Sequence, residues 1–343
     1  MTSISAQLND SSGAHPWTNG IVSEAPALFI VGSYRCGTTS IFRYLADHPE
    51  INPCSIKEPG FFFSRRILEK PSAYPAGHEC WAYLSMFRRK PPAHVLLEGT
   101  ANYLNDPGCA ERIRAAFPNA RIVIALRDPV SRLLSWYKFI LHRGWWPAQS
   151  GFEEWVNAQL RDTRPLTERP YHLQAFEHGF YSGYIAKYFQ VFGKDRVKIV
   201  WFDDLIQKPT DCLVALSEYA GISTDFYNSY RFPKENEAMK ITRPRALALY
   251  RKIHRGILRL FTAFPRFHHS LKVILYGHIE PKIIGLFTGS ADPLTVSGAV
   301  QDDLRARYCS DLAKLQDITG RVPPWKNRFE KCLSQQHNAA HEV

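Results

Sequence analysis

The residues best suited to chemistry lie in one short segment near the start of the chain. It follows an apolar run at 27–31 and precedes the helical spacing of Ile41 and Leu45. A glycine turn that opens a helix leaves backbone N–H groups unpaired at the positive end of the helix dipole, where phosphate binds. We therefore predict a phosphate-binding loop made of Ser33, Tyr34, Arg35, Cys36, Gly37, Thr38, Thr39 and Ser40.

The cation of this loop is placed differently from that of a nucleotide triphosphatase. Gly32 and Gly37 have the G-x-x-x-x-G spacing, but Thr38 stands where the lysine should follow, and Arg35 precedes Gly37. That lysine contacts the β- and γ-phosphates in an ATP-hydrolysing enzyme. A P-loop kinase or nucleotidase remains an alternative, which magnesium dependence would distinguish. Taken alone, Thr39 or Ser40 could simply cap a helix.

A second segment makes the phosphate interpretation stronger. The apolar run 121–126 ends in Arg127-Asp-Pro-Val-Ser-Arg-Leu-Leu-Ser135, so Arg127 follows a strand and Ser135 lies in the next helix. Ligands bind at the carboxyl ends of the strands in an open parallel sheet. Arg127 could instead pair with a carboxylate, but the two segments together predict one anion-binding crevice.

The elements that must position these residues alternate between strands and helices. Short β-branched runs predict buried strands, and apolar residues at helical spacing predict the helices between them. This pattern predicts a P-loop-like, three-layer α/β/α fold with a central parallel sheet. The expected strands are 27–31, 95–97, 121–126 and 197–202, and the expected helices begin near 41, 133, 184, 211 and 304.

Length and composition bound the remaining possibilities. The chain has 343 residues, 45% of them hydrophobic, and a formal charge of +11, which suits a globular protein with anionic partners. We expect a disordered tail at 1–26, one domain at 27–330 and a C-terminal tail at 331–343. There is no signal-peptide or membrane-spanning pattern. The seven scattered cysteines predict reduced thiols and a cytoplasmic location.

Within the domain, residues 243–282 mix Arg and Lys with Leu, Ile, Phe and Tyr. This composition predicts basic amphipathic helices. A solvated face on helices packed against the core is the simpler interpretation, and peripheral contact with an anionic membrane is the sharper one. Nucleic-acid binding is not expected, because the aromatic residues are spread through apparent helical cores rather than exposed for stacking.

The two phosphate-seeking segments resemble motifs of the sulfotransferases that use 3′-phosphoadenosine 5′-phosphosulfate (PAPS). Residues 33–39 look like the family's 5′-phosphosulfate loop, and Arg127 with Ser135 resembles its 3′-phosphate motif. Blocks at 57–62, 97–103 and 179–181 are similar to glycan-modifying (heparan-sulfate-like) and bacterial members, so the resemblance covers roughly residues 27 to 325 with gaps.

The resemblance implies transfer of a sulfuryl group from PAPS to a hydroxyl or amine, with no metal. Glu58 matches the family's base, and Arg35 matches a cation that bridges the 5′-phosphate and the transferring group as an electrostatic clamp. Tyr181 would contact the cofactor. Without the family context, Glu58 would be a surface carboxylate in a turn. The implied acceptor is a carbohydrate, glycolipid or small metabolite; the oligomeric state is not readable.

Three departures from the family pattern bear on the site. Cys36 stands where Gly or Ser is commoner, and a thiol at a helix start is expected to have a lowered pKa. Gly99 replaces a lysine of many heparan-type enzymes, so Lys57 or the basic segment would substitute, or the substrate would differ. The same position leaves open an inactive nucleotide- or polyanion-binding module. The residues that close over the 3′-phosphate are not identified, with Lys240, Arg243 and Arg245 as candidates.

Aromatic residues are the candidates for contact with the acceptor. Aromatic faces stack on sugars and apolar chains alike. Candidates that follow the chemistry-bearing blocks in sequence are His78, Trp81, Tyr83, Tyr103, Trp145 and Trp146, while His142 has no assigned role.

Overall fold

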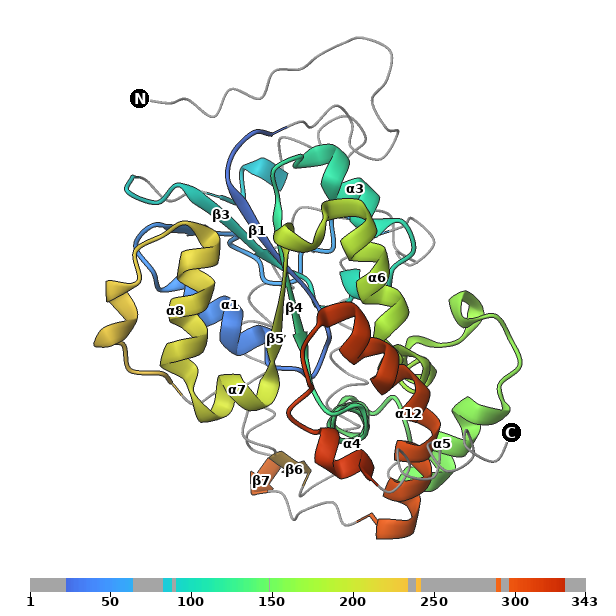
Figure 1. Ribbon diagram of the computed structural model, residues 1–343. Helices are drawn as coiled ribbons and strands as arrows, with labels where there is room; N and C mark the ends of the chain where they lie inside the picture. Colours follow the sequence, from blue (N-terminus) through green and yellow to red (C-terminus); the bar gives the residue numbers. More distant parts are fainter. Residues whose placement is uncertain are drawn as a thin grey trace, which may run out of the picture.

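The computed structural model describes residues 23–63, 83–87, 91–147, 149–233, 239–241, 288–290 and 296–330. Its core is a five-stranded parallel sheet in the order β2-β3-β1-β4-β5 (Figure 1). The strands are β1 (Ala27–Gly32), β2 (Ile51–Pro53), β3 (Val95–Gly99), β4 (Arg121–Leu126) and β5 (Val197–Trp201). Thus the prediction of a parallel α/β sheet is confirmed.

Helices cover both faces of this sheet, as Figure 1 shows. One face packs against α1 (Thr38–Ala46) and α8 (Pro209–Ala220). The other carries α3 (Cys109–Ala116), α4 (Pro129–Arg143), α5 (Phe152–Arg161), α6 (Tyr181–Phe192) and α12 (Gly298–Thr319). Alternate residues of β1 enter the two cores, Leu28 and Ile30 on the first face and Phe29 and Val31 on the second.

The strand order creates the position where a ligand is expected. From β1 the chain passes to β2 and β3 on one side, whereas β4 and β5 lie on the other side. The connections after β1 and β4 therefore diverge, β1 into α1 and β4 into α4, which pack on opposite faces. Such a switch point leaves an opening at the carboxyl ends of the strands. Both predicted phosphate segments begin there.

Local sequence explains where α4 begins and ends. Asp128 caps the helix by accepting a hydrogen bond from Val130 N at 3.0 Å, Pro129 occupies the first turn, and Gly144 ends it in the left-handed conformation. The sequence did not predict β2, α3 or α5. Phe202, expected in a strand, instead begins α7 (Phe202–Gln207).

The outer parts of the domain are only partly described. Strands β6 (Met239–Ile241) and β7 (Thr288–Ser290) form a separate antiparallel pair. The predicted tails and the basic segment 243–282 lie outside the described residues, apart from 23–26. None of the helices in the described ranges is long and apolar enough to cross a membrane.

The cysteines differ from the prediction at one position. Cys36, Cys54, Cys109 and Cys212 are free thiols, whereas Cys309 is disulfide-bonded. The expectation that all cysteines are reduced was therefore wrong at Cys309. Pairing depends on proximity in the folded chain, which the sequence spacing did not reveal.

Candidate functional site

The loop between β1 and α1 has the backbone shape of an anion site. Arg35 and Gly37 are left-handed, with φ of 64° and 83°. A Cβ on Gly37 would lie 2.8 Å from Leu205 and 3.0 Å from Phe202 in α7, so glycine fits the packing as well as the conformation. No side chain caps the first turn of α1, and no acidic residue lies in it. The helix dipole therefore favours negative charge at this end.

The two segments that the sequence singled out meet in one place. Arg35 Nε donates a hydrogen bond to Ser135 Oγ at 3.1 Å, although the residues are 100 positions apart. Arg127 Nη1 donates to the Arg35 carbonyl oxygen at 3.4 Å. The Arg35 guanidinium lies 5.3 Å from the Phe139 ring centroid, and that of Arg127 lies 4.5 Å from the Phe202 centroid. The carboxyl ends of β1 and β4 thus bring two guanidinium groups to the same loop.

These charges are not neutralised by protein carboxylates. Within the described part of the chain, neither Arg35 nor Arg127 forms an ion pair. Burial lowers the pKa of Arg35, and the neighbouring Arg127 lowers it further. The buried Ser33 hydroxyl has no hydrogen-bond partner there either. Two cations, an orphaned hydroxyl and a helix N-terminus fit a polyanionic ligand. The side chain of Thr38 is buried, and those of Thr39 and Ser40 are partly exposed.

Three of the predicted cofactor residues lie behind the loop rather than on its open side. Tyr34 is 5% exposed, packs 4.4 Å from the Trp136 ring centroid, and has its hydroxyl 3.1 Å from His178 Nδ1. Tyr181 is 1% exposed and donates to the Arg127 carbonyl at 2.9 Å. Cys36 is fully buried, and burial raises its pKa to about 11, so the expected lowering was wrong. These side chains hold the loop in place.

The Lys57–Glu58 turn lies at the end of β3, the strand next to β1. Glu58 N donates to the Gly99 carbonyl at 2.9 Å, which ties the turn to the end of β3. The Glu58 side chain is 49% exposed, and its Oε1 lies 2.6 Å from Lys57 Nζ. After burial and Tyr34, the negative charge of Glu58 is a further cause that raises the pKa of Tyr171.

Arg35 and Glu58 share an unusual backbone. Among the described residues they are the two non-glycine positions with positive φ, 64° and 63°. The left-handed conformation costs an ordinary side chain about 1 kcal/mol, and such costs concentrate at functional sites. This observation marks the same two residues that the sequence predicted as clamp and base.

At Gly99, where many heparan-type enzymes carry lysine, the structure leaves little space for a side chain. A Cβ at this position would lie 2.9 Å from the Phe42 ring of α1. A longer side chain therefore requires Phe42 to move. Within the described ranges, Glu58 forms its ion pair with Lys57.

A pocket beside Arg127 adds residues that the sequence analysis missed. It has a volume of about 260 Å³ and is lined by Arg127, Ser131, Phe202, Asp203, Ile206, Gln207 and Arg328. Phe202 and Asp203 directly follow β5, so the rule about carboxyl ends of strands could have found them. Arg328 comes from a 3₁₀ turn at 326–329 and pairs with the buried Asp128 at 2.8 Å. No local signal pointed to it.

The aromatic residues considered for the acceptor cleft differ in their exposure to solvent. Tyr83 and Tyr103 are fully buried and belong to the core, which removes them as candidates for an acceptor cleft. Tyr83 instead donates to Glu98 Oε2 at 2.5 Å. Trp145 is 44% exposed and Trp146 is half-buried. His78, Trp81, Arg243 and Arg245, and the side chain of Lys240, lie outside the description.

Comparison with known proteins decides the family. The model of the sulfotransferase family (Sulfotransfer_3) matches residues 26–225, more than half of the chain. The chain belongs to the sulfotransferase family. The match includes the phosphate loop, the Lys57–Glu58 turn and the segment from Arg127 to Ser135.

Curated relatives share this domain at modest identity. A bifunctional heparan sulfate N-deacetylase/N-sulfotransferase 1 of Caenorhabditis elegans is 26% identical over 221 residues, 63% of this chain and 24% of the relative. A membrane-associated sulfotransferase, kil1, of Dictyostelium discoideum is 34% identical over 119 residues, 33% of this chain and 23% of the relative. This sulfotransferase therefore spans about a quarter of the length of these relatives.

A solved structure shares the fold over most of the chain. The sulfotransferase from Alicyclobacillus acidocaldarius superposes with a TM-score of 0.60 and 23% sequence identity, covering 86% of this chain and 96% of that one. The similarity confirms the P-loop-like α/β architecture.

Proposed function

We propose that this sulfotransferase uses PAPS as the donor and a hydroxyl or amine of a carbohydrate, glycolipid or similar molecule as the acceptor. The contact that carries the proposal is the junction of Arg35, Ser135 and Arg127, because it joins two phosphate-seeking segments into one site. The saccharide part is supported by relatives named for heparan sulfate N-sulfotransferase activity.

The donor fits the charges and the space at the switch point. The loop amides and Arg35 would hold the 5′-phosphosulfate, and Arg127 with Ser135 would hold the 3′-phosphate. The pocket of about 260 Å³ beside Arg127 and Phe202 would take the nucleoside. Tyr181, whose hydroxyl reaches the Arg127 carbonyl, would orient Arg127 rather than contact the donor directly.

PAPS supplies an activated sulfuryl group. Glu58 would take the proton of the acceptor hydroxyl or amine as that atom forms its bond to sulfur, while the bond from sulfur to the 5′-phosphate oxygen breaks with its electron pair staying on the phosphate. Arg35 would stabilise the negative charge that builds on the departing oxygen, as a guanidinium that stays protonated. Lys57, 2.6 Å from Glu58, would contribute positive charge in place of the absent lysine at position 99.

Calorimetric titration with adenosine 3′,5′-bisphosphate tests the donor assignment. We expect binding that requires the 3′-phosphate and needs no magnesium, with adenosine 5′-monophosphate binding more weakly. Binding of ATP with Mg²⁺ in preference to the bisphosphate would overturn the proposal. Incubation with PAPS and a panel of desulfated saccharides and glycolipids, followed by mass spectrometry for the added sulfuryl group, then identifies the acceptor class.

A further inference from the structure

Arg132 is a buried cation in the donor half of the site for which the proposed chemistry has no use. It lies on α4 between Arg127 and Ser135, and its side chain is fully buried. One terminal nitrogen donates to the Ala175 carbonyl oxygen. Its Nε and other terminal nitrogen are buried without a hydrogen-bond partner. Buried N–H groups of a guanidinium that lack a hydrogen-bond partner carry a large desolvation cost, so Arg132 lowers the stability of the fold unless another interaction offsets this cost.

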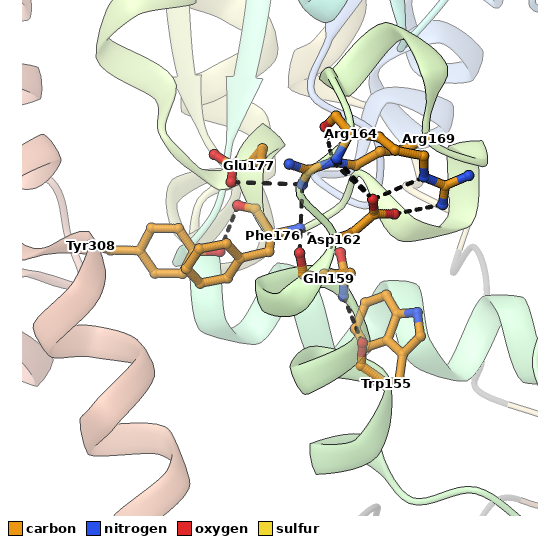
Figure 2. A network of polar contacts seen from close by, with 8 residues as sticks. All are labelled: Trp155, Gln159, Asp162, Arg164, Arg169, Phe176, Glu177 and Tyr308. Carbon is orange, nitrogen blue, oxygen red and sulfur yellow. Dashed lines mark hydrogen bonds and ion pairs between the residues drawn. The ribbon is translucent and has the colours of Figure 1, made fainter.

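The segment next to Ala175 takes part in a network of polar contacts, which Figure 2 shows around Phe176. Phe176 N donates to Gln159 Oε1 at 2.9 Å, and the Phe176 carbonyl accepts from the Tyr308 hydroxyl at 2.8 Å. Arg169 approaches Asp162 and Glu177 within 4.0 and 3.9 Å. Ala175 and His178 are therefore fixed neighbours of Arg132 rather than parts of an adaptable loop.

No neighbouring group neutralises the charge of Arg132. Its guanidinium lies 4.9 Å from the ring centroid of Tyr34 and 5.9 Å from that of Tyr181. Burial raises the pKa of Tyr34 to about 12 and that of Cys36 to about 11, so both are neutral at pH 7. No carboxylate of the described ranges forms an ion pair with Arg132. Within the described ranges, the groups that contact the guanidinium are the rings of Tyr34 and Tyr181 and the Ala175 carbonyl oxygen.

The field of this charge reaches the donor loop from behind. Arg132 opposes the rise in the pKa of Cys36, which lies between Arg35 and Gly37. It also adds to the effect of burial in lowering the pKa of His178, the partner of Tyr34. Arg132, Arg35 and Arg127 thus place three guanidinium groups around one loop, and none has an ion-pair partner among the residues described. A buried cation that the protein leaves uncompensated is stabilised by any anion bound nearby.

We propose that Arg132 is a positioning residue whose buried charge is balanced by the phosphates of the bound donor, across the ring of Tyr34. It does not touch the donor. Its guanidinium packs on the ring of Tyr34 and so holds the loop in the shape that binds an anion. Without a bound anion, the unbalanced buried charge lowers the stability of the folded protein. The proposal rests on the proposed function, because it takes a nucleotide with phosphate groups as the ligand of the loop.

Two substitutions of Arg132 separate charge from packing. Arg132→Met removes the charge and keeps an unbranched side chain, whereas Arg132→Lys keeps the charge and loses the planar contacts. Affinity for adenosine 3′,5′-bisphosphate is measured by calorimetry at two salt concentrations, and the melting temperature is measured with and without the bisphosphate. Arg112→Met is the matched control, because Arg112 is buried too but is paired with Asp106.

For Arg132→Met we expect about a tenfold or greater loss of bisphosphate affinity, an unchanged salt dependence, and a ligand-free melting temperature equal to or above that of the wild type. Arg132→Lys should retain affinity within about threefold because the charge remains. Arg112→Met should lower the melting temperature, since it leaves a buried carboxylate unpaired, and should leave affinity unchanged.

A lower ligand-free melting temperature with unchanged affinity in Arg132→Met would give Arg132 a purely structural role and overturn the inference. If Arg132→Met does not fold, Arg132→Lys decides, because a loss of affinity with the charge retained contradicts a charge-based role. Failure of the wild type to bind the bisphosphate would overturn the proposed function itself, and the inference with it. The two failures are therefore distinguishable.

Discussion

The two halves of the candidate site share a left-handed residue and differ in almost everything else. Arg35 and Glu58 have nearly the same φ, 64° and 63°. The loop around Arg35 is held by Ser135, Arg127, Tyr34 and Tyr181, whose contacts come from β4, α4 and α6. Glu58 is half exposed, and its side chain is paired with the adjacent Lys57.

The loop around Arg35 is therefore a preformed binding site, whereas the Glu58 side chain is open to solvent. A loop that must bind phosphates gains affinity when its cations and amides are already in place, because little ordering is left to be done on binding. A base needs a carboxylate that can reach a proton on an incoming acceptor. We therefore expect substitutions in the two halves to separate donor affinity from turnover and from stability.

The largest effect should come from the exposed half. Glu58→Gln should lower turnover by about 10²- to 10⁴-fold, the usual contribution of a general base, while affinity for adenosine 3′,5′-bisphosphate stays nearly constant. Initial rates and calorimetry measure the two quantities. Glu153→Gln, at an exposed position of α5, is the control. Equal losses of rate and affinity would show that Glu58 belongs to the donor half.

Removing a cation from the preformed half should act on affinity. Arg127→Ala should weaken bisphosphate binding by about 1.5 to 3 kcal/mol, roughly ten- to 150-fold, because it deletes a charged hydrogen-bond donor. Arg121→Ala, at the other end of β4, is a matched control, since Arg121 lies over Tyr219 and away from the loop. Calorimetry on both variants measures the difference. A similar loss in both variants would mean that net charge rather than position matters.

Acid should destabilise the support of the preformed half. Burial, with a contribution from Arg132, lowers the pKa of His178 from 6.5 to about 3. Between these values the unfolded chain binds a proton that the folded protein does not, so stability falls as pH falls. The slope is about 1.4 kcal/mol per pH unit well inside this window.

Urea unfolding at pH 7 and pH 5 measures this dependence. His178→Asn, which keeps an acceptor for the Tyr34 hydroxyl, should lose less stability between these pH values than the wild type. His94→Asn, at an exposed position, should behave like the wild type. Identical pH dependence in the wild type and His178→Asn would place the acid sensitivity elsewhere.

The smallest effect should follow from breaking the ion pair in the exposed half. Lys57→Met should change the free energy of unfolding by less than about 1 kcal/mol, because exposed pairs contribute little. Chemical denaturation measures this change. The rate of turnover should fall measurably even where the free energy of unfolding hardly changes, since Lys57 forms an ion pair with Glu58. A loss of several kcal/mol would mean that the turn is as firmly built into the fold as the phosphate loop.

The sequence predicted the parts of the molecule whose signals are local. The apolar runs of β1, β4 and β5 are short and continuous because both faces of a parallel sheet are buried. Gly37 and the hydroxyl residues after it indicated the loop, and Asp128-Pro129 matched the start of α4. It missed β2, which has three residues, and the amphipathic helices α3 and α5.

The errors came from contacts between distant residues. Tyr83 and Tyr103 have the composition of an aromatic binding surface, but they pack around Phe62 and Glu98 in the core. Cys36 lies at a helix start, where the dipole lowers a thiol pKa, yet burial acts more strongly in the opposite direction. Cys309 is disulfide-bonded although its spacing gave no indication of it.

The sequence by itself determined the class of fold and the two segments that meet at the phosphate site, because the period of apolar residues, the glycine turn and the strand-to-helix junctions are properties of neighbouring positions. Only the tertiary structure decided which side chains face the opening and which support it from behind. Tyr34 and Tyr181 are buried, and the buried Arg132 has no ion-pair partner among the residues that the structure describes. Burial and charge balance depend on elements more than 40 residues apart, such as α4 and the segment around Ala175.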